Sequence, residues 1–232
     1  MAHLSLGSDP ARAKPPGSQI RLGDLDRVEP ISRNFGFDRG ACIDRRYIEQ
    51  FLAREQAAIR GRVLEIAENT YTRQFGGNRV TRSEVLFTEP GHRNGTLVGD
   101  LSRPETLPES AFDCVILTQT LQHIYDTHAT VRTLHRVLKP RGAVLATMPG
   151  ISHVSRFDMD RWGDFWRFTT ASAVRLFGDV FGIGNVTCAS WGNAYAAVGL
   201  LHGLAIEDLD ASLLDQHDRD YQVIVTVAAT RA

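Results

Sequence analysis

The hydrophobic positions of this chain follow two spacings, which alternate along most of its length. Short apolar runs predict buried strands at residues 63–67, 85–88, 96–98, 112–117, 143–148, 186–191 and 223–228. Between these runs, apolar residues three or four positions apart predict helices at residues 43–59, 127–139, 171–178 and 194–205. Strands that alternate with helices are typical of an α/β fold with a mostly parallel sheet. We therefore expect one seven-stranded sheet, with helices placed on both faces by right-handed crossovers.

The beginning of the chain lacks this patterning. Residues 1–40 are rich in glycine, proline and charged side chains, and they contain no apolar block of the signal-peptide type. We expect them to form a flexible leader that could also act as a lid, followed by a single domain over residues 41–232. No run approaches the ~18 apolar residues that a membrane helix needs, so we expect no membrane partner.

The composition narrows the classes of partner. The 26 Lys and Arg residues balance 27 Asp and Glu residues, and the net charge of −1 does not favour nucleic-acid binding. Three cysteines, Cys42, Cys114 and Cys188, stand at unrelated spacings, which argues against a disulfide framework or a zinc site. Reduced thiols are typical of the cytoplasm. We expect a cytoplasmic monomer or homodimer without a metal ion.

Acidic residues stand where several of the predicted strands end. Glu65 interrupts the apolar run at 63–67, where an ionised carboxylate is costly unless it is paired or faces a ligand. Glu89 and Asp100 follow the second and third strands. Because ligands of parallel α/β sheets bind outside the carboxyl ends of the strands, these acids are candidate ligand-binding groups. Local roles are the alternative: Glu65 could cap the next turn, Glu89 could be solvated, and Asp100 could form its own turn.

Five segments stand in an order and at spacings that a known family shares. They are Val63-Leu64-Glu65-Ile66-Ala67, Val98-Gly99-Asp100-Leu101, Phe112 to Ile124, Leu134 to Gly142, and Asp164 to Thr169. Together they resemble the class I S-adenosylmethionine-dependent methyltransferases of the small-molecule type, and in particular the methyltransferases of type 11. The resemblance spans roughly residues 40–230. It implies a Rossmann-like fold and S-adenosyl-L-methionine as the cofactor.

The resemblance also implies which residues bind the cofactor: Glu65, Ala67, Glu68, Asn69, Tyr71, Glu89, Asp100, Leu101, Gln119 and Thr120. Glu65 would accept hydrogen bonds from the ribose or the ammonium group, Glu89 from the ribose, and Asp100 from the adenine amino group. Leu101 would pack on the adenine ring or in the core. Gln119 would contact the methionine moiety.

The first motif departs from the family pattern. After the acid, the family usually has a glycine-rich loop that lets the backbone approach the methionine part of the cofactor. This chain has Ala67-Glu68-Asn69-Thr70-Tyr71 there, and the nearest glycines are Gly76 and Gly77. Either the loop takes another path, with Glu68 compensating in part, or the loop is degenerate.

Two histidines are candidates for a general base. Methyl transfer from a sulfonium is an in-line displacement, so the main requirement is alignment of the acceptor. A base helps when the acceptor is a hydroxyl group, and histidines ordinarily titrate near neutral pH. His123 follows the fourth strand and His153 follows the fifth; the alternative for each is a surface or packing role. Thr120, just before His123, could contact the cofactor or cap a helix.

Aromatic and basic residues suggest an acceptor pocket. Trp162, Trp166 and Arg167 cluster in the chain, and aromatic rings stack well on sugar or ring faces. The alternative is that they anchor the following helix. Tyr47 could belong to a segment that folds over the cofactor, although its helical spacing favours the apolar face of the helix at 43–59.

We therefore predict a methyltransferase that acts on an oxygen atom of a small molecule, such as a sugar or another secondary metabolite. One alternative is a methyltransferase-like binding protein with a degenerate cofactor loop. A nicotinamide-dependent oxidoreductase is less favoured, because the chain lacks the G-x-G-x-x-G sequence.

Overall fold

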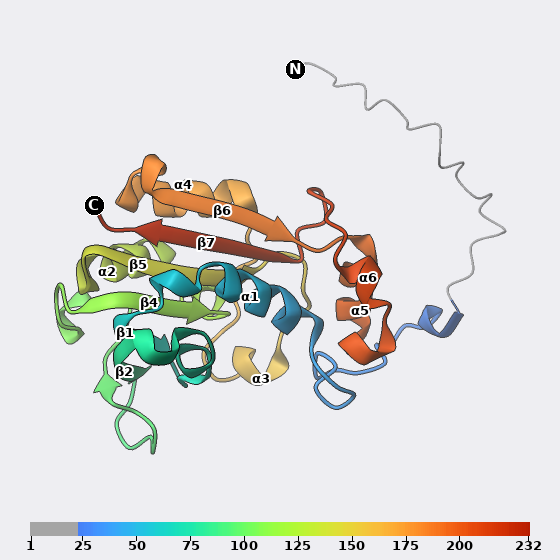
Figure 1. The fold of residues 1–232 in the computed structure, drawn as a ribbon. Helices are drawn as coiled ribbons and strands as arrows, with labels where there is room; N and C mark the ends of the chain where they lie inside the picture. Colours follow the sequence, from blue (N-terminus) through green and yellow to red (C-terminus); the bar gives the residue numbers. More distant parts are fainter. Residues whose placement is uncertain (1–22) are drawn as a thin grey trace.

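The computed structural model describes residues 23–232, which form a seven-stranded sheet with helices on both faces (Figure 1). The strands are β1 (Gly61–Ile66), β2 (Val80–Phe87), β3 (Leu97–Val98), β4 (Phe112–Thr118), β5 (Leu138–Pro149), β6 (Val186–Trp191) and β7 (Ile224–Thr230). Their order is β3-β2-β1-β4-β5-β7-β6, and β7 runs antiparallel to both of its neighbours. The predicted mostly parallel sheet is confirmed. The part of the predicted leader at residues 1–22 lies outside the described residues.

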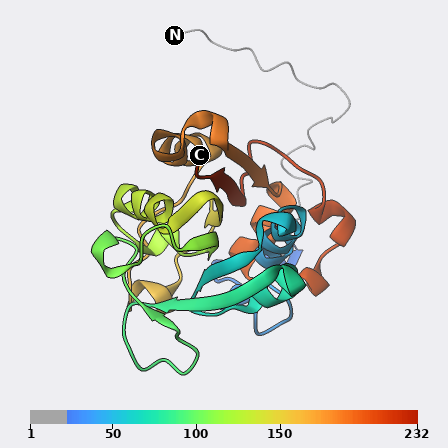
Figure 2. The same cartoon turned by 60° about the vertical axis from the view of Figure 1, so that its left-hand side comes forward.

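Two pairs of helices cover the two faces of the sheet (Figure 2). The helices are α1 (Ile43–Arg54), α2 (Thr127–Val137), α3 (Arg156–Met159), α4 (Thr170–Phe181), α5 (Ala194–His202) and α6 (Ala211–Leu214). The side chains of Val63 and Ile116 pack in one core with α1 and α5, whereas Leu64 and Val115 pack in a second core with α2 and α4. Alternate residues of each strand point to opposite faces, and both faces are covered, which is why consecutive residues such as Val63 and Leu64 are both apolar.

The helix predicted at residues 127–139 ends at Val137, and β5 begins directly after it. Leu138 already pairs with Phe112 of β4, so residues 138–142 begin β5. The register shifts between Phe112 and Cys114, and Arg141 has a φ of 64°. This β-bulge lets the chain pass through Pro140 without losing the pairing that follows, so the strand predicted at residues 143–148 begins earlier, at Leu138.

Two other helix boundaries differ from the prediction. The helix predicted at 43–59 ends at Arg54, and Gly61 is the first residue of β1. The helix predicted at 194–205 ends at His202. Gly203 closes it in the left-handed conformation, with a φ of 69°, and donates its N–H to Leu200.

The connection between β1 and β2 contains a π-helical turn at Thr72–Gly76 and a 3₁₀ turn at Gly77–Arg79. The connection is therefore compact for a crossover between parallel strands, which usually contains a longer helix. The loop between β2 and β3 projects from the edge of the sheet (Figure 2).

Within residues 23–232, no helix is both long enough and apolar enough to cross a membrane.

Candidate functional site

The carboxyl end of β1 turns directly into a short helical segment, and Glu65 holds this turn. Its carboxylate accepts hydrogen bonds from the backbone N–H groups of Tyr71 (3.2 Å) and Thr72 (2.8 Å), and from the Thr72 hydroxyl (2.7 Å). Glu65 is only 2% exposed. The carboxylate therefore caps the turn that follows β1, which is one of the two roles left open by the sequence.

The Glu65 carboxyl group is important for stability. In Glu65→Ala, two backbone N–H groups and one hydroxyl lose their acceptor, so we expect the free energy of unfolding to fall by about 2–4 kcal/mol. Burial raises the pKa of Glu65 above its ordinary value of 4.5, and the hydrogen bonds offset this only in part. The stabilising contribution is thus complete below pH 4.5 and declines as the pH rises through the folded-state pKa.

Urea unfolding should therefore show that Glu65→Ala lowers the free energy of unfolding, relative to the wild type, by more at pH 4 than at pH 8. Glu68→Ala is the matched control, because Glu68 is exposed and accepts a hydrogen bond only from the Thr70 hydroxyl among the described residues. We expect it to change the free energy of unfolding by less than about 0.5 kcal/mol. Equal effects of the two substitutions would contradict the capping role of Glu65.

Ala67 makes the turn that a glycine would be expected to make. Its φ of 64° lies in the left-handed region, which L-residues other than glycine avoid. The Ala67 N–H donates to Leu86 (3.1 Å), and the N–H of Glu68 donates to Ile66 (2.8 Å). The chain therefore achieves the tight turn after β1 without the glycine-rich loop, and the strain costs about 1 kcal/mol.

This strain predicts that Ala67→Gly raises the free energy of unfolding by up to about 1 kcal/mol. Glycine removes the penalty of the left-handed conformation, but part of this gain is offset because glycine increases the conformational entropy of the unfolded chain. Ala53→Gly, within α1, is a control of opposite sign with an expected loss of about 1 kcal/mol. Thermal unfolding of both variants tests the prediction. A destabilised Ala67→Gly variant would show that the alanine methyl group has a packing role that outweighs the strain.

The other predicted residues of this turn point in different directions. Asn69 donates from Nδ2 to the Ser83 hydroxyl (3.1 Å), and Glu68 lies exposed beside it. The ring of Tyr71 is buried in the core beneath α1, and its hydroxyl accepts a hydrogen bond from Arg45 (3.3 Å). The polar groups of Glu68 and Asn69 therefore remain near the strand end, while Tyr71 connects the turn to α1.

The acids beyond β2 and β3 lie in loops. Glu89 is exposed, two residues past the end of β2. The Oδ1 atom of Asp100 accepts hydrogen bonds from the backbone N–H (2.8 Å) and the hydroxyl (2.7 Å) of Ser102, which forms a local turn. Its Oδ2 atom has only Arg103 nearby, at 3.7 Å, within the described residues. Leu101 is 4% exposed and packs in the core.

The carboxyl end of β4 is also strained. Gln119 has a φ of 45°, its N–H donates to the Thr147 carbonyl (2.9 Å), and its Nε2 atom lies 3.3 Å from the Thr147 hydroxyl. The hydroxyl of Thr120 donates to the Thr118 carbonyl (2.9 Å). Backbone strain of this kind is concentrated at functional sites. Here the left-handed conformation of Gln119 accompanies its contacts with Thr147, near the end of β5.

His123 has one ring nitrogen held by the backbone and is half-buried. Its Nδ1 atom lies 2.7 Å from the Gly163 carbonyl oxygen. Because a carbonyl can only accept, Nδ1 carries the proton, and the neutral ring presents Nε2 as its basic nitrogen. This is the arrangement that a general base requires.

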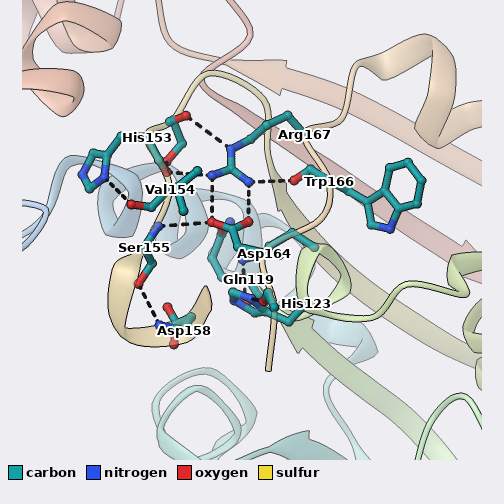
Figure 3. Close-up of polar contacts among 12 residues, drawn as sticks. Gln119, His123, His153, Val154, Ser155, Asp158, Asp164, Trp166 and Arg167 are labelled. Carbon is teal, nitrogen blue, oxygen red and sulfur yellow. Dashed lines mark hydrogen bonds and ion pairs between the residues drawn. The ribbon is translucent and has the colours of Figure 1, made fainter. Parts of the chain in front are cut away.

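A buried ion pair holds the segment that supplies the Gly163 carbonyl (Figure 3). Arg167 donates to both carboxylate oxygens of Asp164, one of them at 2.9 Å. The same guanidinium donates to the carbonyls of Ser152 (3.3 Å) and His153 (2.7 Å), and the Ser155 N–H donates to Asp164 (3.1 Å). The pair therefore ties the loop after β5 to the segment that contacts His123, so Arg167 has little donor capacity left for a ligand.

His153 and Tyr47 are both engaged by protein atoms. The Nδ1 atom of His153 lies 3.0 Å from the Val154 carbonyl, and its ring stacks on Phe35 with a centroid distance of 3.9 Å. Its Nε2 atom is buried and has no partner among the described residues. Tyr47 is 2% exposed and donates its hydroxyl to the Leu214 carbonyl (2.9 Å), so it lies in the core on the apolar face of α1.

Exposed aromatic side chains lie beside His123 and on the segments that adjoin it. Trp162 is 58% exposed, and its ring centroid lies 6.5 Å from that of His123. Trp166 donates its indole N–H to the Tyr125 carbonyl (3.2 Å) and lies beside the Tyr125 ring, which is 71% exposed. Aromatic surface of this kind, held in place yet exposed to solvent, is typical of a binding site.

The sequence reasoning missed the contact of Gly163 with His123 and the ion pair of Asp164 with Arg167. Asp164 and Arg167 are three residues apart, and this spacing of opposite charges was the available signal for an ion pair. Nothing in the sequence indicates that the Gly163 carbonyl reaches His123, forty residues earlier. Within residues 23–232, no group of three His, Cys, Asp or Glu residues is placed to hold a metal ion.

Comparisons with known proteins agree with this geometry. Residues 57–146 match the family model described as a methyltransferase domain. A search of curated proteins gives no match. The solved structures that match share the fold at low sequence identity, so they support the fold alone.

One is a SAM-dependent methyltransferase from Archaeoglobus fulgidus, at 11% identity and a TM-score of 0.52, covering 81% of this chain and 94% of that one. A second is the N-methyltransferase NodS from Bradyrhizobium japonicum in complex with S-adenosylhomocysteine. It has 12% identity and a TM-score of 0.52, and the match covers 90% of this chain and 96% of that one. A third is the cyclase SpnF, with 14% identity and a TM-score of 0.53, and the match covers 88% of this chain and 87% of that one. The sheet order and these likenesses show that the chain has the fold of the class I S-adenosylmethionine-dependent methyltransferases, and residues 57–146 match the methyltransferase-domain model.

Proposed function

We propose that this protein is an S-adenosylmethionine-dependent methyltransferase that methylates a hydroxyl group of a small molecule. The observation that carries the proposal is His123, whose Nδ1 proton is held by the Gly163 carbonyl at the carboxyl edge of the sheet. This leaves a basic nitrogen where the acceptor of such a fold would lie. The exposed aromatic side chains of Tyr125, Trp162 and Trp166 would bind the acceptor beside it.

The polar groups at the strand ends fit the cofactor. Glu68 and Glu89 are exposed acids beyond β1 and β2, suited to an ammonium group or to ribose hydroxyls. The Oδ2 atom of Asp100 would accept a hydrogen bond from the adenine amino group, because Oδ1 already takes both donors of Ser102. The left-handed turn at Ala67 and the side chain of Gln119 would adjoin the methionine moiety, and Glu65 would act on the cofactor through the turn that it caps.

The residues of the chain would then act mainly by position. The bound cofactor supplies a methyl group on a sulfonium, which an acceptor must attack in line. The Asp164–Arg167 pair fixes the Gly163 carbonyl, and Gly163 fixes the orientation of the His123 ring. His123 Nε2 would accept the acceptor hydroxyl proton as the oxygen attacks. His153 is less suited to this step, because its Nε2 atom is buried.

Calorimetric titration with S-adenosylmethionine, S-adenosylhomocysteine and NADH tests the proposal. We expect both S-adenosyl compounds to bind and NADH not to bind. Absence of S-adenosyl binding up to about a millimolar would reject the methyltransferase. Binding without methyl transfer to any of a panel of hydroxylated small molecules would favour a binding protein instead, since the same fold occurs in a protein that is named as a cyclase.

A further inference from the structure

The outward face of α4 carries an open hollow beside the last strand of the sheet. The Cys188 Sγ atom of β6 lies 3.9 Å from the Thr170 carbonyl oxygen at the start of α4, and β6 is the final strand in the sheet order (Figure 1). The hollow therefore lies at an outer edge of the sheet. It has a volume of about 670 Å³, and its lining includes Ala171, Val174, Arg175, Gly178, Asp179 and Ile183.

Apolar residues give the hollow its shape. Ile183 is 66% exposed, and its side chain folds back over Gly178, where an added Cβ atom would lie only 3.2 Å from Ile183 Cδ1. Val174 is half-buried and stands one helical turn before Gly178, on the same side of α4. Because Ala171 and Gly178 have the smallest side chains, a second helix can approach α4 closely along this face.

Two exposed charges of opposite sign flank the apolar part of the hollow. Neither Arg175 nor Asp179 forms an ion pair in the part of the chain that the structure describes. They are four residues apart on α4, but the arginine precedes the acid, which is the less favourable order within a helix. Asp179 also lies in the last turn, where the helix dipole disfavours an acid. The stability of α4 therefore does not account for this arrangement of charges.

The charges and the apolar groups of this face are self-complementary under a two-fold axis. When two α4 helices pack antiparallel with their centres near Leu176 and Phe177, Arg175 of each copy faces Asp179 of the partner subunit. The same register places Val174 of each copy against Gly178 and Ile183 of the partner subunit. Every contact of such an interface occurs twice, so one register satisfies both charges and both apolar groups.

We propose that this face of α4 is the interface of a homodimer, in which a second copy of the chain fills the hollow. The reciprocal match of opposite charges favours a second copy over an unrelated partner, because both members of each pair are present on the same surface. The net charge of −1 leaves little overall repulsion between two copies. This inference goes beyond the proposed function and does not rest on it.

Charge reversal tests the interface through sedimentation velocity of the full chain. We expect the wild type to sediment as a dimer, with twice the 25.7 kDa mass of one chain. Arg175→Asp and Asp179→Arg each place like charges opposite one another at two symmetric positions, so each should raise the dimer dissociation constant about 10- to 100-fold. The variant that combines both substitutions restores opposite charges, and its dissociation constant should return to within about threefold of the wild-type value.

Arg132→Asp is the matched control, because Arg132 is an exposed arginine of α2 and lies outside the hollow. It should leave the dissociation constant of the dimer unchanged. If one of the single variants does not fold, as judged by circular dichroism, the other provides the same comparison.

Three results would overturn the interface. A wild type that stays monomeric at about 100 µM would reject a second copy as the occupant of the hollow. A dimer that neither single reversal weakens would show that the copies meet on another face. A loss in both single variants without recovery in the combined variant would show that Arg175 and Asp179 do not pair across the interface.

Discussion

Asp164→Ala is expected to lower the free energy of unfolding by about 2–4 kcal/mol, because it leaves the Arg167 guanidinium without its carboxylate partner. The Asp164 side chain is 3% exposed and that of Arg167 is 27% exposed, so the loss should be at the lower end of the values known for buried pairs. The substitution should also loosen the position of His123, because the pair holds the segment whose Gly163 carbonyl accepts a hydrogen bond from the His123 ring. Urea unfolding measures the loss of stability.

The matched control is Asp160→Ala. Asp160 pairs with Arg156 at 3.1 Å, but the two side chains are 57% and 75% exposed. An exposed pair of this kind contributes less than about 1 kcal/mol. A loss in Asp164→Ala no larger than that in Asp160→Ala would show that the buried pair does not anchor the segment.

The pH dependence of stability provides a second readout for Asp164. Burial by itself would raise the pKa of this carboxyl group, but the hydrogen bonds and charge of Arg167 more than offset burial and lower the pKa below 3.8. A lowered folded-state pKa means that the stabilisation is present above pH 3.8 and is lost as the pH falls through the folded-state pKa. The stability difference between the wild type and Asp164→Ala should therefore shrink below about pH 4.

His123→Asn should lower kcat for a hydroxyl acceptor about 10²- to 10⁴-fold, the range typical of a lost general base. The asparagine amide can still donate to the Gly163 carbonyl, so this variant removes the basic nitrogen and keeps the contact that positions residue 123. The Kd for S-adenosylhomocysteine should remain within about twofold of the wild-type value, because the role assigned to His123 concerns the acceptor. Steady-state kinetics and calorimetry separate the two effects.

His128→Ala is the control for this experiment, since His128 is an exposed residue of α2. It should leave kcat unchanged. A kcat for His123→Asn equal to that of the wild type would show that alignment of the acceptor alone drives the reaction, and it would remove the main reason for proposing an oxygen acceptor.

Much of the candidate site could be predicted from the sequence because it lies at strand ends. Glu65, Asp100 and Gln119 all stand at or just beyond a strand, where the topology of a parallel sheet directs a ligand. Their local roles could not be anticipated to the same degree. Glu65 caps a turn and Asp100 forms one, and these are properties of backbone geometry that residue type alone leaves open.

The sequence by itself determined the class of fold, because each strand is a short apolar run and each main helix has an apolar face. The sequence placed the start of the fifth strand too late, because a bulge at Arg141 lets Leu138 pair with β4 ahead of Pro140 and Gly142. The tertiary structure alone decided which polar groups meet. The Gly163 carbonyl reaches His123, and the Arg45 guanidinium reaches Tyr71, across 40 and 26 positions of the chain. Such contacts depend on how separate elements pack, whereas sequence periodicity reports only which face of one element is buried.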